Sequence, residues 1–96
     1  YAKGAERERQ LVKLLREDSW VATRTAGSHG AADVFALKRG RRPRLLQLKA
    51  GGRNWPARGD RARLSVDAAR ADADAFVVFW EPRKPPEFLS EAEWPR

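Results

Sequence analysis

Asp33, Gln47 and Lys49 are three side chains that together could hydrolyse a phosphodiester bond. Carboxylate and amide oxygens are hard ligands of the kind that hold Mg²⁺. A bound metal ion polarises a phosphate and activates water, and a nearby lysine offsets the negative charge that develops during attack. The three residues therefore predict a metal-assisted hydrolytic site, provided that the fold brings them together.

The segments that carry these residues read as the two strands of a β-hairpin. Residues 34–38 and 45–49 are rich in apolar side chains, and a basic turn joins them. If the hairpin turns about Arg41, position 33 lies opposite position 49, and position 35 lies opposite position 47. Side chains alternate along a strand, so we expect Asp33 and Phe35 on the same face as Gln47 and Lys49. An acid, an amide and an ammonium then converge at the open end of the hairpin.

Glu8 is a candidate fourth member of this site. Residues 4–17 read as a helix whose buried stripe is centred on Leu11, Leu14 and Leu15, and Glu8 lies about 40° from that centre. A carboxylate on the core-facing side costs desolvation energy unless something binds it. Taken by itself, the helix favours a simpler interpretation, in which Glu8 lies one turn out from the core and meets solvent or an arginine.

The composition points to a nucleic-acid partner. The chain of 96 residues holds 20 Lys and Arg against 13 Asp and Glu, with a formal charge of +7 and a pI near 10.8. A positive field on so small a body most often attracts nucleic acid. The alternatives are a charge for solubility or a basic tail, and the spread of basic residues from Lys3 to Arg96 argues against a tail.

Cysteine is absent, which excludes disulfides, zinc–cysteine sites and thiol catalysis. Domains stabilised without disulfides are typical of the cell interior. No apolar run approaches the ~18 residues that a membrane span needs. We therefore expect a cytoplasmic, intracellular protein with no membrane contact; a prokaryotic or phage origin is implied only by the family resemblance described below.

The periodicity predicts an α/β fold in a single domain that occupies residues 1–96. Residues 26–31, all small or polar, read as a loop. Ser90 and Glu93 match a capping box near the end of the chain. The remaining expected elements are a helix at 4–17, strands at 20–25, 34–38 and 45–49, a loop at 50–63, a helix at 65–74 that Ser65 could cap, and a strand at 76–80. The order α-β-β-β-α-β predicts a mixed sheet flanked by helices.

The arrangement of Asp33, a hairpin, and then Gln47-Leu48-Lys49 resembles the PD-(D/E)xK nuclease core, with Ala32 in place of the proline and Gln47 in place of the second acid. The surrounding segments are similar to those of the archaeal Holliday-junction resolvases: Lys3-Gly4-Ala5, Glu8-Arg9, Leu11-Val12-Lys13-Leu14-Leu15, Arg24-Thr25-Ala26-Gly27-Ser28 and Asp33-Val34. The likeness covers the first half of the chain well, and residues 65–80 in outline. It implies a restriction-endonuclease-like core.

The resemblance also implies roles for individual residues. Glu8 and Asp33 would hold Mg²⁺ or Mn²⁺ together with the backbone carbonyl of Leu48, and Lys49 would be the catalytic lysine. Gln47 would be a ligand that offers a dipole without negative charge, so we expect weaker metal binding than in a site with a third carboxylate.

Further residues are candidates for contact with DNA, namely Arg9, Arg24, Ser28, His29, Arg53, Trp55 and Arg58. Ser28, in the loop before Asp33, would also belong to the catalytic set. His29 is expected either to contact a phosphate or to have no role. Trp55 could stack on an exposed base or pack on the core of its own or a partner chain. The arginines between residues 39 and 44 could grip phosphates, or serve only to keep the hairpin turn soluble.

Three functions fit these observations. The leading interpretation is a structure-selective endonuclease that resolves four-way (Holliday) DNA junctions in recombination and repair. The second is another nuclease on the same scaffold, acting on flaps, ends or a short sequence. The third is a non-catalytic DNA-binding module. Junction selectivity rests on the family resemblance alone, because a fold does not determine a substrate.

A four-way junction has two-fold symmetry and needs paired cuts in opposed strands. One domain with one site cannot readily make both cuts, so we expect a homodimer acting on branched DNA. Val77, Phe79, Trp80 and Trp94 are candidates for its interface.

Overall fold

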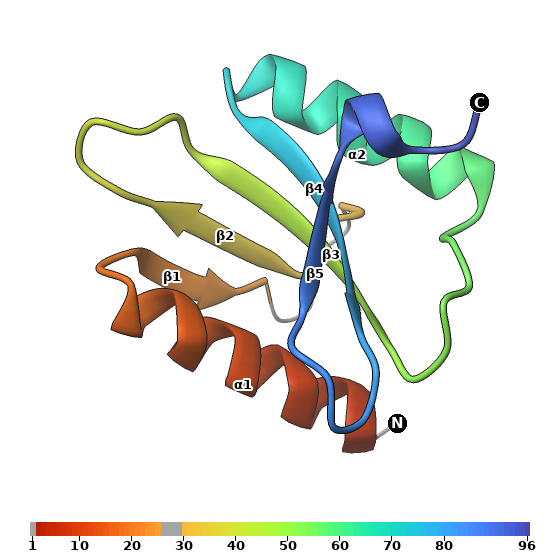
Figure 1. The fold of residues 1–96 in the computed structure, drawn as a ribbon. Helices are drawn as coiled ribbons and strands as arrows, with labels where there is room; N and C mark the ends of the chain where they lie inside the picture. The colour runs from red at the N-terminus through yellow and green to blue at the C-terminus, as the bar shows by residue number, and fades with distance from the viewer. Residues whose placement is uncertain (1, 26–29) are drawn as a thin grey trace.

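The chain folds around one five-stranded sheet with a helix on each face (Figure 1). The computed structural model describes residues 2–25 and 30–96. Its elements are α1 (Ala2–Glu17), β1 (Val21–Arg24), β2 (Val34–Leu37), β3 (Arg44–Ala50), α2 (Arg58–Arg70), β4 (Asp74–Trp80), β5 (Glu87–Ser90) and the 3₁₀ helix η1 (Glu91–Glu93). The predicted mixed α/β fold is confirmed. No helix in the described part of the chain combines the length and the apolar content needed to cross a bilayer.

The strands lie across the sheet in their chain order, β1-β2-β3-β4-β5. Neighbouring strands are antiparallel except for β3 and β4, which are parallel. A parallel pair needs a crossover connection, and α2 supplies it. β3, which carries Gln47 and Lys49, is therefore the central strand.

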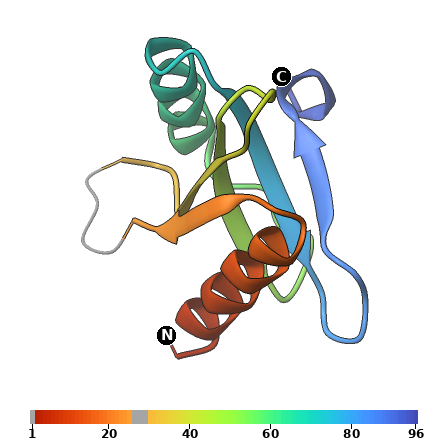
Figure 2. The same cartoon turned by 90° about the vertical axis from the view of Figure 1, so that its left-hand side faces the viewer.

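Alternation along β3 divides the core into two layers. Leu46 lies in a buried cluster with Leu11 and Leu15 of α1, whereas Leu45 lies in a second cluster with Leu64 of α2. The two helices therefore cover opposite faces of the sheet, as the turned view shows (Figure 2). Burial of each such leucine stabilises the fold by about 2 kcal/mol.

The buried stripe of α1 differs slightly from the expected one. Leu11, Val12 and Leu15 are buried, but Leu14 is 37% exposed and lies outside the stripe. Glu8 precedes Leu11 and Val12 by three and four residues, so it continues the same stripe by one turn. Its side chain is 24% exposed, which places the carboxylate at the edge of the core rather than in open solvent.

The second helix begins earlier than predicted. α2 begins at Arg58, and Ser65 lies within the helix, where its hydroxyl donates to Glu91 Oε2 at 2.7 Å instead of capping. Only Leu64 and Ala68 of α2 are buried, so the apolar periodicity that marks a helix in sequence is weak here.

The end of the chain adds a strand that the expected order lacks. β5 is a four-residue edge strand that follows three prolines, and its short apolar content gives little strand signal. The capping box predicted from Ser90 and Glu93 is confirmed at the start of η1, where the Ser90 N–H donates to Glu93 Oε2 at 2.9 Å.

The apolar residues proposed for a subunit interface belong to the core instead. Val77 and Phe79 are buried, and Trp80 and Trp94 are partly buried against the two clusters. For Val77 and Phe79 the interface prediction is wrong, because β4 packs on both of its faces. For the partly buried Trp80 and Trp94 it stays a prediction. Exposed apolar side chains lie elsewhere, on the face of β1 and β2 that points away from α1, at Val21, Phe35 and Leu37.

Candidate active site

Asp33 lies next to β3, just beyond the paired end of β2. Phe35 pairs with Leu45, and the regular pairing ends with Val34 opposite Leu46. The Asp33 N–H donates to the carbonyl of Leu46, the partner of Val34, at 2.8 Å, so the regular ladder ends at Val34. The acid therefore lies where β3 continues past the end of β2 with only β4 beside it.

The register expected from the sequence, with Phe35 opposite Gln47, is wrong by two residues, because Phe35 pairs with Leu45. The hairpin is centred on Gly40, not on Arg41, and Gly40 has a φ of 77°, in the left-handed region that favours glycine. A shift of two residues leaves every paired side chain on its original face, because the period of a strand is two. Phe35 therefore shares a face with Gln47 and Lys49, as predicted, whereas Asp33 lies beyond the paired residues and reaches β3 through its side chain.

The carboxylate of Asp33 is bound to the backbone of β3. The Leu48 N–H donates to Asp33 Oδ2 at 2.8 Å, taking the side chain as its acceptor where β2 no longer supplies a carbonyl. In an extended strand the N–H and C=O of one residue point to the same side. The Leu48 carbonyl thus faces the same gap as the carboxylate, where the resemblance places it as a ligand.

The pKa of the Asp33 carboxyl is raised. Burial raises the pKa of its carboxyl above the ordinary 3.8, while the Leu48 N–H lowers it, the Glu8 charge raises it and the Lys49 charge lowers it. Burial outweighs the opposing effects, because a charge loses hydration when it leaves water. Glu8 and Lys49 lie close enough to influence Asp33, so the three charged groups form one electrostatic unit.

Glu8 reaches this unit from α1 and is paired with Arg24 at the end of β1. Arg24 Nε donates to Glu8 Oε1 at 3.0 Å, and the two side chains are 31% and 24% exposed. The simpler interpretation of Glu8, in which it meets an arginine, is confirmed, and its role as a metal ligand stays a prediction. The carboxylate meets an arginine, and it also lies close enough to raise the pKa of Asp33.

Gln47 has a buried amide oxygen, Oε1, without a hydrogen-bond partner among the described residues. Buried polar atoms are nearly always paired, and an unpaired one costs about 1–3 kcal/mol. No other buried side-chain nitrogen or oxygen in the described ranges is in this condition. An open acceptor next to the residue that binds the Asp33 carboxylate is what a bound cation would use.

Comparison with known proteins finds a family whose model matches this sequence. A family model of the archaeal Holliday junction resolvases (Hjc) matches residues 1–54, which include Glu8, Asp33 and Lys49. The chain belongs to this family. A search of curated protein sequences finds no match.

A solved structure agrees with the assignment to the Hjc family. The chain is similar to Hjc of Archaeoglobus fulgidus, a Holliday junction resolvase from an archaeal hyperthermophile, with 25% sequence identity and a TM-score of 0.79. The similarity covers 88% of this chain and 73% of that one. It therefore extends beyond residue 54 to most of the fold.

The candidate site of this chain has two acids and an amide. In the described ranges no three His, Cys, Asp or Glu residues gather into a group that could hold a metal. The available donors are the carboxylates of Glu8 and Asp33, Gln47 Oε1 and the Leu48 carbonyl. All four are oxygens, so the set fits a hard divalent cation.

The arginines expected to contact DNA lie in different surroundings. Arg9 is exposed on α1, and Arg24 is bound to Glu8. Arg58 is exposed at the start of α2. Arg53 forms an ion pair with Glu87 on β5. Ser28 and His29 lie outside the described residues.

Trp55 packs on the core of its own chain. Its ring meets Phe79 edge to face, with centroids 4.9 Å apart and an interplanar angle of 85°. It is partly buried beside the cluster under α2. Of the two interpretations of Trp55, the structure favours core packing, and a contact with DNA stays a proposal.

Thr25 is a positioning residue that sequence reasoning missed. Its N–H donates to the Asp33 carbonyl at 3.0 Å, and its hydroxyl donates to the Ala32 carbonyl at 2.6 Å. These bonds tie the residues before β2 to the end of β1 and so help to fix Asp33. The only signal in the sequence was a threonine at the end of a predicted strand, which is common in proteins of any function.

Proposed function

We propose that this chain resolves four-way DNA junctions by metal-dependent hydrolysis of a phosphodiester bond in each of two opposed strands. The observation that carries the proposal is the buried, unpartnered Gln47 Oε1, next to Leu48, whose N–H binds the Asp33 carboxylate. Glu8 of α1 lies close enough to raise the pKa of that carboxyl. Membership of the Hjc family supports the junction as the substrate.

Mg²⁺ or Mn²⁺ is the cofactor that fits this donor set. Glu8, Asp33, Gln47 Oε1 and the Leu48 carbonyl would hold the ion. Such an ion would polarise the phosphate and lower the pKa of a bound water. Because Gln47 contributes no negative charge, the site would bind Mg²⁺ weakly and favour Mn²⁺, which is the stronger binder of the two.

The protein's own groups hold and neutralise the reacting phosphate. The Leu48 N–H fixes the Asp33 carboxylate before substrate arrives, which removes part of the cost of reorganisation. Lys49 lies close enough to Asp33 to lower its pKa, and its ammonium would bind a phosphate oxygen and offset the charge that develops on it. Arg24 neutralises Glu8 and would pair with a phosphate of the bound strand.

Asp33→Asn tests the site, because the asparagine side-chain oxygen can still accept from Leu48. Labelled four-way junction, flap and linear duplex are each incubated with Mg²⁺ or EDTA. The wild-type chain should cut the junction with Mg²⁺ only. Asp33→Asn should lower cutting by orders of magnitude while junction binding survives, since affinity comes mainly from phosphate contacts.

The other outcomes identify the alternatives. Equal cutting of flap or duplex would indicate another nuclease on the same scaffold. Binding without cutting, in Mg²⁺ and in Mn²⁺, would indicate a non-catalytic module. Normal cutting by Asp33→Asn would remove the proposed site.

We also propose that the active form is a homodimer. Val21, Phe35 and Leu37 line an apolar groove of about 470 Å³ that reaches Asp67 of α2 and Ala71, which follows α2. These three side chains are 72%, 44% and 53% exposed, which is unfavourable in water. A second copy is the occupant that a two-fold junction calls for, because an isologous contact buries the same surface on both chains and presents two sites.

A further inference from the structure

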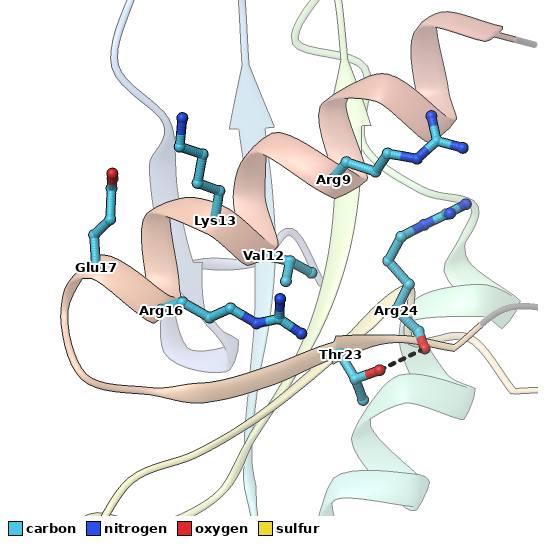
Figure 3. A pocket seen from close by; sticks show the side chains of 7 residues that line it. All are labelled: Arg9, Val12, Lys13, Arg16, Glu17, Thr23 and Arg24. Carbon is cyan, nitrogen blue, oxygen red and sulfur yellow. Dashed lines mark hydrogen bonds between the residues drawn. The ribbon is translucent and has the colours of Figure 1, made fainter.

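A groove between α1 and β1 gathers positive charge beside the proposed active site (Figure 3). Its volume is about 580 Å³. Four of its seven lining residues are basic and one is acidic, and the full set is Arg9, Val12, Lys13, Arg16, Glu17, Thr23 and Arg24. The proposed catalytic residues do not account for this charge.

The groove is continuous with the active site through Arg24. Arg24 lines the groove and donates to Glu8. Arg9 follows Glu8 on α1, and Lys13 and Arg16 follow about one and two turns further along. At about 1.5 Å per residue, Glu8 to Arg16 spans about 12 Å. One strand of B-DNA carries a phosphate every ~3.4 Å along the helix axis, so the groove has the length of about three phosphates.

The cations of the groove differ in how they are held. Arg16 Nε and Nη2 donate to the Ala22 carbonyl on the open edge of β1, at 3.2 and 3.0 Å, which fixes the guanidinium and leaves Nη1 for a further acceptor. Arg9 has a long, exposed ion pair with Glu6 at 3.8 Å, which contributes little. Lys13 is exposed and has no hydrogen bond or ion pair with any residue that the structure describes.

The residues that line the groove indicate which class of ligand it would bind. The positive charges follow one another along α1 instead of converging on one point, which suits a chain of phosphates better than a single phosphate. None of the described residues that line the groove is aromatic, so these residues offer no surface on which a base could stack. Contacts of this kind position a nucleic acid without reading its sequence.

We propose that this groove is a track for the backbone of the DNA strand that is cut, with Lys13 and Arg16 contacting phosphates next to the scissile one. The proposal rests on the proposed nuclease function. It adds Lys13 and Arg16 to the residues expected to contact DNA. It also predicts the path of the cut strand, which would run from Glu8 toward the C-terminal end of α1.

The salt dependence of junction binding tests the track. Lys13→Gln is compared with wild type and with Arg70→Gln, which removes one charge from α2 on the opposite face of the sheet. Binding is measured in EDTA over a range of salt concentrations. Loss of one phosphate contact should lower the slope of log K against log salt by about 0.9, and weaken binding about eightfold at 0.1 M salt. Lys13→Arg should restore binding, and Arg70→Gln should bind like wild type.

A second measurement locates the contact on the DNA. Single phosphates on either side of the cut are replaced by neutral methylphosphonates, and each junction is bound by wild type and by Lys13→Gln. When the methylphosphonate replaces the phosphate that Lys13 contacts, junction binding by wild type should weaken about eightfold, and junction binding by Lys13→Gln should not change. The coupling should appear within about three phosphates of the cut, on one side only.

Two results would overturn the track. One is a Lys13→Gln variant that binds no more weakly than Arg70→Gln, and the other is an equal loss for both proteins at every neutral phosphate. Lys13 is exposed, so unchanged thermal unfolding should confirm that Lys13→Gln is folded. Cutting of the unmodified junction by wild type with Mg²⁺ is scored separately, so failure of the nuclease function is distinguished from failure of the track.

Discussion

The Leu48 N–H and Asp33 Oδ2 are 2.8 Å apart, and this hydrogen bond ties an acid that precedes β2 to the strand that carries Gln47 and Lys49. The backbone of β3 therefore aligns the acid with the amide and the ammonium. Glu8 is the exception, since it belongs to α1 and depends on the docking of that helix. The site thus has a part built on the sheet and a part carried by the helix.

Lys49→Gln should lower junction cutting by about 10²–10³-fold with little change in junction affinity, because its charge acts on the phosphate undergoing reaction. The same change removes the positive charge that lowers the pKa of Asp33, so that pKa should rise further. Cleavage kinetics measure the first effect, and carboxyl NMR of Asp33 measures the second. A drop in cutting with no movement of the Asp33 resonance would place Lys49 away from the acid.

Gln47→Glu should lower the metal concentration needed for half-maximal cutting, because a carboxylate adds Coulombic attraction that an amide lacks. The maximal rate need not rise, since a glutamate can also pair with Lys49. Mg²⁺ and Mn²⁺ titrations of both proteins, followed by cleavage and by calorimetry, give the midpoints. If the two proteins have the same metal midpoints, Gln47 lies outside the coordination shell, and Asp33, Glu8 and the Leu48 carbonyl are the remaining candidate ligands.

The raised pKa of Asp33 predicts a pH-dependent stability. Ionisation of Asp33 is less favourable in the folded chain than in the unfolded chain. Its contribution is therefore fully present below the unfolded pKa of 3.8 and is lost as the pH rises through the higher, folded pKa. In EDTA, Asp33→Asn should melt at a higher temperature than wild type near neutral pH, and the two should converge in acid. In saturating Mn²⁺ the wild-type chain should melt at the higher temperature instead, because the ion binds only the intact site.

Leu37→Lys should convert the proposed dimer into a monomer, because it places a charge in the apolar groove of β1 and β2. Leu14→Lys is a matched control, since Leu14 is also exposed but lies on α1, away from that groove. Sedimentation of both variants, free and with junction DNA, measures the oligomeric state. A wild-type chain that sediments as a monomer in both conditions would contradict the homodimer.

The hairpin shows why part of the site could be predicted from the sequence. The face shared by Phe35, Gln47 and Lys49 depends only on whether residue numbers are odd or even, so its prediction survived an error of two residues in the register. The register itself depends on the conformation of Gly40, and a basic turn with one glycine admits more than one centre.

Other features depend on tertiary contacts that a sequence does not display. The pairing of Glu8 with Arg24 joins residues that are 16 apart and lie on different elements. α2 has only two buried positions, Leu64 and Ala68, which give too little periodicity to place the start of the helix at Arg58. The buried state of Val77 and Phe79 follows from packing on both faces of β4, whereas an apolar run in sequence fits core and interface equally well.

The division of the carboxylates between helix and sheet has a consequence for the chain before it is fully folded. An unfolded or half-folded chain carries the same formal charge of +7, so it would already adhere to DNA. It would hold Asp33 and Glu8 apart until α1 seats Leu11 and Leu15 on the sheet. The charge that attracts DNA is therefore present before folding, whereas the two carboxylates come together only when α1 is docked on the sheet.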